Sequence, residues 1–304
     1  MTSSSPEPTL SVRGLTRRYG ERTVVDHLDF GLRPGVMTGF LGANGAGKTT
    51  TMRMIMGMLE PTEGEVLWHG RPITAADLSG FGYMPEERGL YPKQKILNQL
   101  AYLGRLHGMS GSAARSRAQE LLERFGLAER GKDLLESLSL GNQQRVQIAA
   151  ALIHQPHCLV LDEPFSGLDP VAVDSMVQML DDLLRRGVPV LFSSHQLDLV
   201  ERLCEDVVIL HEGRLVASGR AQDLRDEAPL RYRLRAGQDT GWVREIHGLE
   251  VLDVEGTEAL LELPHGEQGE MLRGEVLRRA VERDLREFQR IQPTLSEIYR
   301  KATR

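Results

Sequence analysis

A glycine-rich turn between an apolar strand and a helix constrains this chain more than any other feature. VMTGFLG reads as a short buried strand, GANGAGKTT at 42–50 follows it, and KTTTMRMIMGML predicts a helix that Pro61 and Gly64 close. In that order, the backbone N–H groups of the turn and the positive end of the helix face one point. The segment therefore predicts a phosphate-binding loop.

The side chains of this loop indicate a nucleoside triphosphate with Mg²⁺. Lys48 supplies a mobile ammonium for the β- and γ-phosphates, and we expect it to be catalytic for that reason. Thr49 offers a hydroxyl to Mg²⁺, which prefers hard oxygen ligands. A glycine-rich turn without a ligand is the alternative, and the strand before and helix after it argue against that. The predicted nucleotide-binding residues here are Gly42, Asn44, Gly45, Ala46, Gly47, Lys48, Thr49 and Thr50.

Two adjacent acids end another apolar strand, CLVL, in LVLDEPFSGLD. The carboxyl edge of such strands is where open α/β sheets present ligands. Asp162 is predicted to hold Mg²⁺ directly or through a water, and Glu163 to orient or deprotonate the attacking water. Adjacent acids commonly only start a solvated loop, but the apolar lead-in favours the catalytic interpretation.

Two further side chains are candidates around the same nucleotide. His195 follows the strand VPVLFSS, where a neutral imidazole could contact the γ-phosphate and the water. A lone histidine in this position is more often structural, and only the preceding motifs favour catalysis. Tyr19 in RRYG could stack its ring on an adenine base.

A second anion-binding group begins the helix in LSLGNQQRV. Ser139, Gly141, Asn142 and Gln143 present hydroxyl, backbone N–H and amide groups suited to phosphate. The glycine-rich loop already serves the phosphates in its own subunit. This second group therefore makes sense if it closes over a nucleotide that another copy binds.

The pattern along the chain predicts an α/β domain with a small α+β extension. Residues 1–9 read as a disordered leader, 10–219 as the main domain with a helical subdomain at about 88–146, and 220–304 as the extension. SVRGLTRRYG and TVVDHLDFGL alternate as an antiparallel edge would, and DVVILHEGRLVASG reads as a closing hairpin. In the extension, RYRLRAG, EVLDVEG and EALLELP predict strands, and EVLRRAVERDL and TLSEIYRKA predict helices.

Charge and hydropathy exclude two kinds of direct partner. The net charge of −6 argues against binding nucleic acid through a general basic surface, so we expect no nucleic-acid partner. No window approaches the 18 or more consecutive apolar residues that span a bilayer. Any membrane role must then come through another polypeptide.

From about Leu10 to about Ser218 these motifs resemble the ATP-binding subunits of ABC transporters. The resemblance implies a P-loop NTPase cassette of the ABC type, with a mixed sheet, an antiparallel edge and a helical subdomain. It implies a head-to-tail dimer with two ATP molecules, each between Gly42–Thr50 of one subunit and Ser139–Gln143 of its mate. Asp169 matches the loop through which the two sites communicate, and His195 matches the switch histidine.

Two positions depart from the family pattern. Pro85 is followed by Glu86 where the family usually has Gln, which brings a negative charge near Mg²⁺ and makes Glu86 a candidate metal ligand. This places coupling to the transmembrane partner in doubt. The signature reads LSLGN where LSGGQ is usual; Gly141 preserves close backbone approach, but Leu140 and Asn142 alter the side chains around it.

The resemblance implies an ATPase subunit that drives export through separate transmembrane permease subunits, as a homodimer or a heterodimer with a similar ATPase. The expected location is cytoplasmic, peripheral on the inner face of the cell membrane through the permease. The segment Glu86–Gly104, including Leu90 and Tyr91, is the candidate docking surface for a permease helix. The alternatives are a soluble ABC-type ATPase acting on ribosomes, nucleic acid or a cytosolic assembly, and a non-hydrolysing regulatory module.

Overall fold

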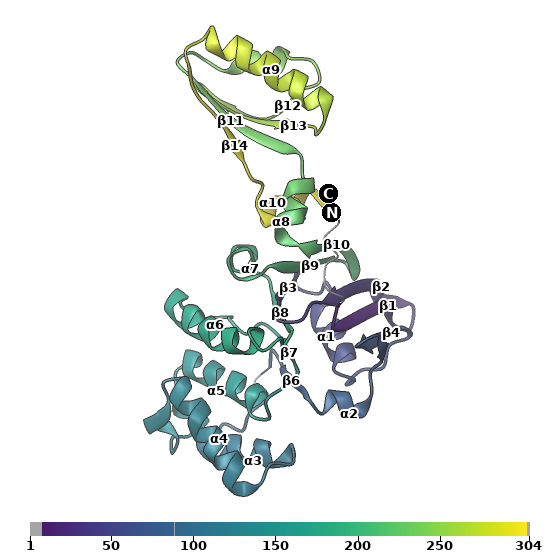
Figure 1. The fold of residues 1–304 in the computed structure, drawn as a ribbon, viewed down its shortest axis with the longest axis vertical. Helices are drawn as coiled ribbons and strands as arrows, with labels where there is room; N and C mark the ends of the chain where they lie inside the picture. Colours follow the sequence, from purple (N-terminus) through teal and green to yellow (C-terminus); the bar gives the residue numbers. More distant parts are fainter. Residues whose placement is uncertain (1–7, 88, 303–304) are drawn as a thin grey trace. The chain divides into compact units, whose positions relative to one another are not determined.

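The computed structural model describes residues 8–87 and 89–302, which form two compact units that divide between Arg220 and Ala221 (Figure 1). Residues 1–7 of the predicted leader lie outside the described residues. The predicted end of the leader at residue 9 is too late, because the Thr9 N–H donates to the Leu32 carbonyl oxygen at 2.8 Å. Ordered pairing therefore begins before residue 10.

The first unit contains a four-stranded antiparallel sheet in the order β2-β1-β4-β5. Its strands are β1 (Leu10–Tyr19), β2 (Arg22–Leu32), β4 (Glu63–Trp68) and β5 (Arg71–Pro72). The predicted pairing of β1 with β2 is confirmed, since they run antiparallel from Leu10 opposite Leu32 to Tyr19 opposite Arg22. β1 also pairs with β4, and β4 pairs with β5, in a sheet separate from the parallel one. The sequence did not predict β4 or β5.

A six-stranded sheet in the order β10-β9-β3-β8-β7-β6 forms the centre of this unit. Neighbouring strands from β9 to β6 are parallel, and β10 pairs antiparallel with β9 at the edge as the predicted hairpin. All residues of β3, β7 and β8 are buried, as expected for parallel strands covered on both faces. The strands are β3 (Met37–Leu41), β6 (Phe81–Met84), β7 (Cys158–Leu161), β8 (Val190–Ser194), β9 (Asp206–His211) and β10 (Arg214–Arg220).

The helix after β3 is shorter than the sequence predicted. α1 (Lys48–Ile55) ends before Gly57, which adopts φ 65°, and the Met58 N–H donates to the Arg53 carbonyl oxygen at 2.9 Å. A glycine in the left-handed region after the last turn is a common helix stop. The helix therefore ends well before Pro61. Three further helices of this part of the chain are α2 (Ala75–Leu78), α6 (Pro170–Leu184) and α7 (Leu197–Leu203).

Three helices follow one another in the helical part of the first unit (Figure 1, blue to teal). They are α3 (Ile96–Leu106), α4 (Gly111–Arg124) and α5 (Leu140–Leu152), with 3₁₀ turns η1 (Ala128–Arg130) and η2 (Leu135–Ser137) between α4 and α5. These helices lie where the sequence predicts a helical subdomain, and α5 continues six residues beyond the expected limit at 146. In the described parts of the chain, no helix is both long and apolar enough to cross a membrane.

The second unit is an antiparallel sheet in the order β12-β13-β11-β14. Leu272, Val276 and Ala280 of α9 are buried in a core of its own with Leu234 and Leu261. Three strands match the prediction, whereas β14 was missed. The elements are α8 (Ala221–Glu227), β11 (Leu230–Ala236), η3 (Gly241–Glu245), β12 (Glu250–Glu255), β13 (Glu258–Leu263), α9 (Glu267–Val281), β14 (Leu285–Ile291) and α10 (Leu295–Ala302).

Candidate active site

A cavity of about 440 Å³ opens at the glycine-rich loop after β3. Its volume lies within the range of small-molecule sites. Arg22 and Val24 line it although sequence reasoning did not select them. The register could have suggested Arg22, because it lies opposite Tyr19 across a two-residue turn. The lining residues are Tyr19, Arg22, Val24, Asn44, Gly45, Gly47, Lys48, Thr49, Thr50, Glu86, Asp162 and Glu163.

Gly45 and Gly47 of the loop differ in why a side chain is unfavourable there. Gly47, which precedes α1, has φ 99°, and a Cβ there would lie 2.9 Å from the Val24 carbonyl oxygen. Gly45 has φ 82°, yet a Cβ there would meet no atom within 4 Å. Both angles disfavour L side chains, but only Gly47 is also confined by its neighbours. Ala46 is buried beneath the loop and does not line the cavity.

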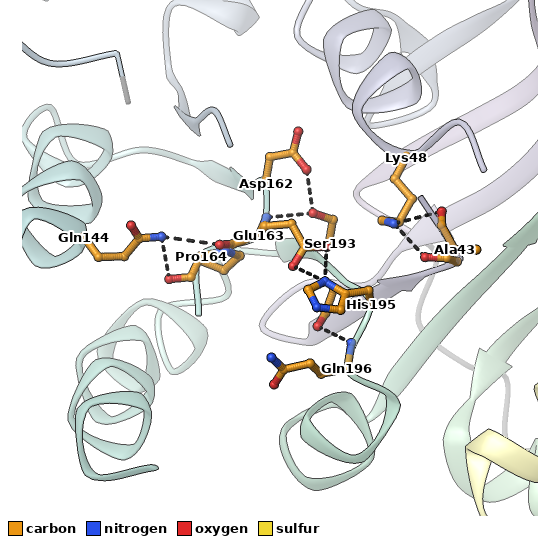
Figure 2. A network of polar contacts seen from close by, with 11 residues as sticks. Ala43, Lys48, Gln144, Asp162, Glu163, Pro164, Ser193, His195 and Gln196 are labelled. Atoms are coloured by element: carbon orange, nitrogen blue, oxygen red, sulfur yellow. Dashed lines mark hydrogen bonds and ion pairs between the residues drawn. The ribbon is translucent and has the colours of Figure 1, made fainter. Parts of the chain in front are cut away.

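Lys48, the first residue of α1, is buried and turned onto its own loop (Figure 2). Its Nζ donates to the carbonyl oxygen of Gly42 at 2.6 Å and to that of Ala43 at 3.3 Å. Burial lowers the pKa of the Lys48 ammonium, and the charges of Glu163 and Asp162 oppose that shift. The cation thus faces two acids across the cavity while the loop holds it.

Asp162 follows β7 and presents one carboxylate oxygen without a partner. It is 1% exposed; its Oδ1 accepts a hydrogen bond from Ser193 Oγ at 2.6 Å, whereas Oδ2 has no hydrogen-bond partner among the described residues. A buried acceptor of this kind is suited to a cation or a water bound to one. The hydroxyl-bearing Thr49 and the carboxylate of Glu86 line the same cavity, so the donor set fits Mg²⁺.

Glu163 has the geometry of a positioned base. Its backbone N–H donates to Ser193 Oγ at 2.7 Å, and His195 Nδ1 lies 3.1 Å from both carboxylate oxygens (Figure 2). Its φ of 50° is unusual for a residue with a side chain and is typical of functional positions. Burial raises the pKa of the Glu163 carboxyl, Glu86 adds to that, and His195 and Lys48 oppose it. The carboxylate is therefore held in place with an elevated basicity.

Two residues that the sequence did not single out hold the segment around Glu163 in place. Ser193, near the end of β8, contacts both Asp162 and Glu163 through one hydroxyl. Leu161 of β7 pairs with Phe192 of β8, so Ser193 lies beside the residues that follow Leu161. Gln144 of α5 donates through Nε2 to the carbonyl oxygens of Pro164 at 2.9 Å and Glu163 at 3.3 Å. Both residues lie within the motifs, but their contacts depend on tertiary structure.

The Tyr19 ring lies at the cavity with one side already contacted. The guanidinium carbon of Arg17 lies 4.5 Å from the ring centroid, and Arg17 Nη1 donates to the Glu60 carbonyl oxygen at 2.8 Å. A cation over the ring stabilises its orientation. Tyr19 itself is 50% exposed, which leaves ring surface available for a base.

The second group of predicted residues does not line this cavity. Ser139 is exposed before the first turn of α5, while Gln143 is buried and its Nε2 donates to the Leu138 carbonyl oxygen at 2.9 Å. Asp169 caps α6, accepting a hydrogen bond from the Ala172 N–H at 2.8 Å. The cavity of one chain thus contains the loop and the acids, and it lacks Ser139, Gly141, Asn142, Gln143 and Asp169.

A phosphate-binding loop after the central parallel strand, with an acid pair after β7, defines a P-loop nucleotide-binding protein. The antiparallel sheet and the helical segment between β6 and β7 complete an ABC-type cassette.

Comparison with known proteins identifies the family. A family model described as ABC transporter matches residues 25–166. The chain is 46% identical over 216 residues to the uncharacterized ABC transporter ATP-binding protein YhaQ of Bacillus subtilis, covering 71% of this chain and 72% of that protein. It is 38% identical over 220 residues to the Nod factor export ATP-binding protein I of Ralstonia nicotianae, covering 71% and 68%.

A solved structure of the ATP-binding subunit of an ABC transporter matches with a TM-score of 0.66 at 32% identity, over 72% of this chain and 92% of that one. This protein belongs to the family of ABC transporter ATP-binding proteins.

Proposed function

We propose that this protein is an ATP-hydrolysing subunit that drives export through a separate transmembrane permease. The observation that carries the proposal is a single cavity holding Lys48, Asp162 and Glu163, with Glu163 fixed by His195. Export is supported by the similarity to a Nod factor export ATP-binding protein. A non-hydrolysing module would have no use for a buried, raised-pKa carboxylate held by a histidine.

The side chains divide the work of hydrolysis. Lys48 exchanges its two loop carbonyls for phosphate oxygens and neutralises charge on the terminal phosphates. Glu163 accepts a hydrogen bond or a proton from the attacking water, and its raised pKa favours that transfer. His195 holds the Glu163 carboxylate in line. Tyr19, oriented by Arg17, takes the base.

Thr49 and Asp162, with Glu86 nearby, would hold Mg²⁺ beside the phosphates. The ion supplies charge neutralisation at the phosphate oxygens when it is bound. The partnerless Oδ2 of Asp162 supports this assignment, since Oδ1 is already taken by Ser193. Among the described residues, no group of three or more acidic, histidine or cysteine side chains forms a complete metal site. That suits an ion held largely by nucleotide and water.

We further propose that two copies, or one copy and a similar ATPase, enclose two ATP molecules. The support is the position of Ser139 and Asn142, which do not line the nucleotide cavity of their own chain. The first turn of α5 has no side-chain cap and carries the positive helix end, which is where an anion binds. Asp169, which caps the next long helix α6, would connect the two sites.

A second cavity of about 440 Å³ is the proposed docking groove for a permease helix. It lies between the β6 region and helices α3 and α5, and its lining includes Met56, Met84, Leu78, Leu90 and Leu103. An apolar groove of this kind suits the apolar face of a helix.

The predicted docking segment Glu86–Gly104 contributes Gly89, Leu90 and Leu103 to this groove, whereas Tyr91 is exposed outside it. Arg88 of that segment lies outside the described residues. Docking here would bring the protein to the inner face of the membrane.

Glu163→Gln tests the proposal. The variant should bind ATP and accumulate as a dimer, while hydrolysis falls by about 10²–10⁴-fold because only the base is removed. Phosphate release and mass by light scattering, each with and without ATP and Mg²⁺, measure both effects. Lys48→Ala is the matched variant, which should lose ATP affinity instead. Wild-type turnover by Glu163→Gln would reject the assignment.

A further inference from the structure

Three arginines lie around the turn between β1 and β2, and two of them are engaged within the chain. Arg17 Nη1 donates to the Glu60 carbonyl oxygen at 2.8 Å, and Arg18 Nη1 lies 2.8 Å from a carboxylate oxygen of Glu63. Arg22 is exposed, and its side chain makes no hydrogen bond or ion pair with any described residue. Arg22 nevertheless lines the nucleotide cavity. Its guanidinium is therefore available to a group from outside the chain.

The strand that carries Arg22 passes along one wall of this cavity. Arg22 pairs with Tyr19 across the turn, at the end where the base is proposed to bind. Two residues further on, Val24 also lines the cavity, and its carbonyl oxygen lies 2.9 Å from where a Cβ on Gly47 would be. β2 has a bulge at Val24, because consecutive residues of β1 pair with the residues on either side of it. Bulges re-aim side chains and are common beside active sites.

The distance along β2 places Arg22 between the two ends of the site. Two residues of a strand span about 7 Å, which a long arginine side chain can bridge. The Tyr19 ring lies at one end of this span and the glycine-rich loop at the other. A nucleotide that stacks its base on Tyr19 and places its terminal phosphates in the loop must pass Arg22.

The residues proposed to bind nucleotide leave one phosphate without a cation. Tyr19 takes the base, while Lys48, with Mg²⁺ when it is bound, neutralises the β- and γ-phosphates. The α-phosphate lies between them and carries its own negative charge, in a cavity that three carboxylates already line. Among the described lining residues, the cations are Lys48 and Arg22. Arg22 is thus the cation that remains for the α-phosphate.

We propose that Arg22 is a nucleotide-binding residue whose guanidinium pairs with the α-phosphate. The planar fork of N–H donors matches the spacing of phosphate oxygens. Because ATP and ADP share the α-phosphate, Arg22 strengthens the binding of both to the same extent and does not affect adenosine. This inference rests on the proposed ATP site and goes beyond it by giving a role to a residue outside the glycine-rich loop and the acid pair.

The test compares three ligands that share the base and differ in their phosphates. Arg22→Met removes the charge and keeps an unbranched side chain. Its dissociation constants for ATP and for ADP should both rise by about 10-fold, since a charge-assisted hydrogen bond is lost. Its dissociation constant for adenosine should stay that of the wild type. Calorimetric titration with EDTA present, so that hydrolysis does not intervene, measures ATP and ADP, and adenosine is measured as a competitor of ADP.

Three further variants serve as controls. Arg18→Met removes an exposed cation at the same turn that does not line the cavity, so all three affinities should match the wild type. Lys48→Ala should weaken ATP more than ADP, because it also loses the γ-phosphate. Arg22→Lys keeps the charge and should recover part of the lost affinity for ATP and ADP. The melting temperature of Arg22→Met should stay within about 2 °C of the wild type, since the side chain is exposed and has no partner among the described residues.

The pattern of losses decides where the guanidinium binds. A loss confined to ATP would place it at the γ-phosphate, and an equal loss for adenosine would place it at the base or the ribose. Either result overturns the assignment, and so do unchanged affinities for all three ligands. If the wild type binds neither ATP nor ADP, the proposed function fails and the assignment fails with it.

Discussion

At the scale of single residues, the site depends on hydrogen bonds that join neighbouring strands. Ser193 Oγ contacts both the carboxylate of Asp162 and the backbone N–H of Glu163. The order of motifs was sufficient to predict the two acids, His195 and the loop. It did not predict Ser193 or Gln144, since a serine or glutamine inside a motif has no distinctive pattern until the strands are in register.

The raised pKa of Glu163 predicts the acid side of the pH–rate profile. A base works only when ionised, so hydrolysis should be lost as pH falls through a midpoint above 4.5, the ordinary value for this carboxyl. Glu86 is one cause of the elevation, and Glu86→Gln should therefore move the midpoint to lower pH. Single-turnover hydrolysis across pH, with ATP ionisation common to both proteins, measures the difference. A midpoint that is unchanged or higher in Glu86→Gln would contradict this.

At the scale of elements, the sequence predicted the strongly patterned segments and missed those that tertiary contacts define. The apolar strands β3, β7 and β8 and the helices α3 to α5 were expected. β6 has four residues like β7, but a glycine interrupts its sequence FGYM, whereas CLVL of β7 is a continuous apolar run. In the second unit, α9 ends at Val281, and Asp284 at φ 62° turns the chain into β14. No glycine marks that turn, so the sequence predicted a helix that extends past Val281.

The loop before α1 predicts different effects for two alanine substitutions. Gly45→Ala should lower stability by about 1 kcal/mol, because only the left-handed angle is unfavourable there. Gly47→Ala should lower it further, since the added Cβ also meets the Val24 carbonyl oxygen at 2.9 Å and must move the β2 backbone or the helix. Urea unfolding without nucleotide compares them. Equal losses would show that the loop relaxes freely around residue 47.

At the scale of the whole molecule, each of the two units has a tryptophan buried in a hydrophobic core. Trp68 is buried in the first unit, where it packs edge-on against Phe81 at 4.7 Å between ring centroids. Trp242 is buried in the core of the second unit. The chain contains these two tryptophans. Single-tryptophan variants therefore report one unit each.

We expect ligand to stabilise only the unit that contains the loop. In Trp242→Phe the remaining Trp68 should report an unfolding midpoint that rises with ATP and Mg²⁺. The free energy of unfolding of this unit should increase by about 2.7 kcal/mol at 100-fold excess of ligand over the dissociation constant. In Trp68→Phe the unfolding midpoint that Trp242 reports should not change when ATP and Mg²⁺ are added. Denaturant unfolding followed by tryptophan fluorescence measures both. Shifts of equal size would show that the two cores unfold as one cooperative body.

The resting position of Lys48 has a consequence for nucleotide exchange. Because Nζ is already bonded to the Gly42 and Ala43 carbonyl oxygens, the Lys48 ammonium has hydrogen-bond acceptors within its own loop. Entry of a nucleotide replaces neutral oxygens by charged ones, so the number of bonds changes little while each bond gains the attraction between opposite charges. The preference among nucleotides then depends on the charge of the phosphate chain. When the product leaves, Lys48 Nζ bonds again to the Gly42 and Ala43 carbonyl oxygens.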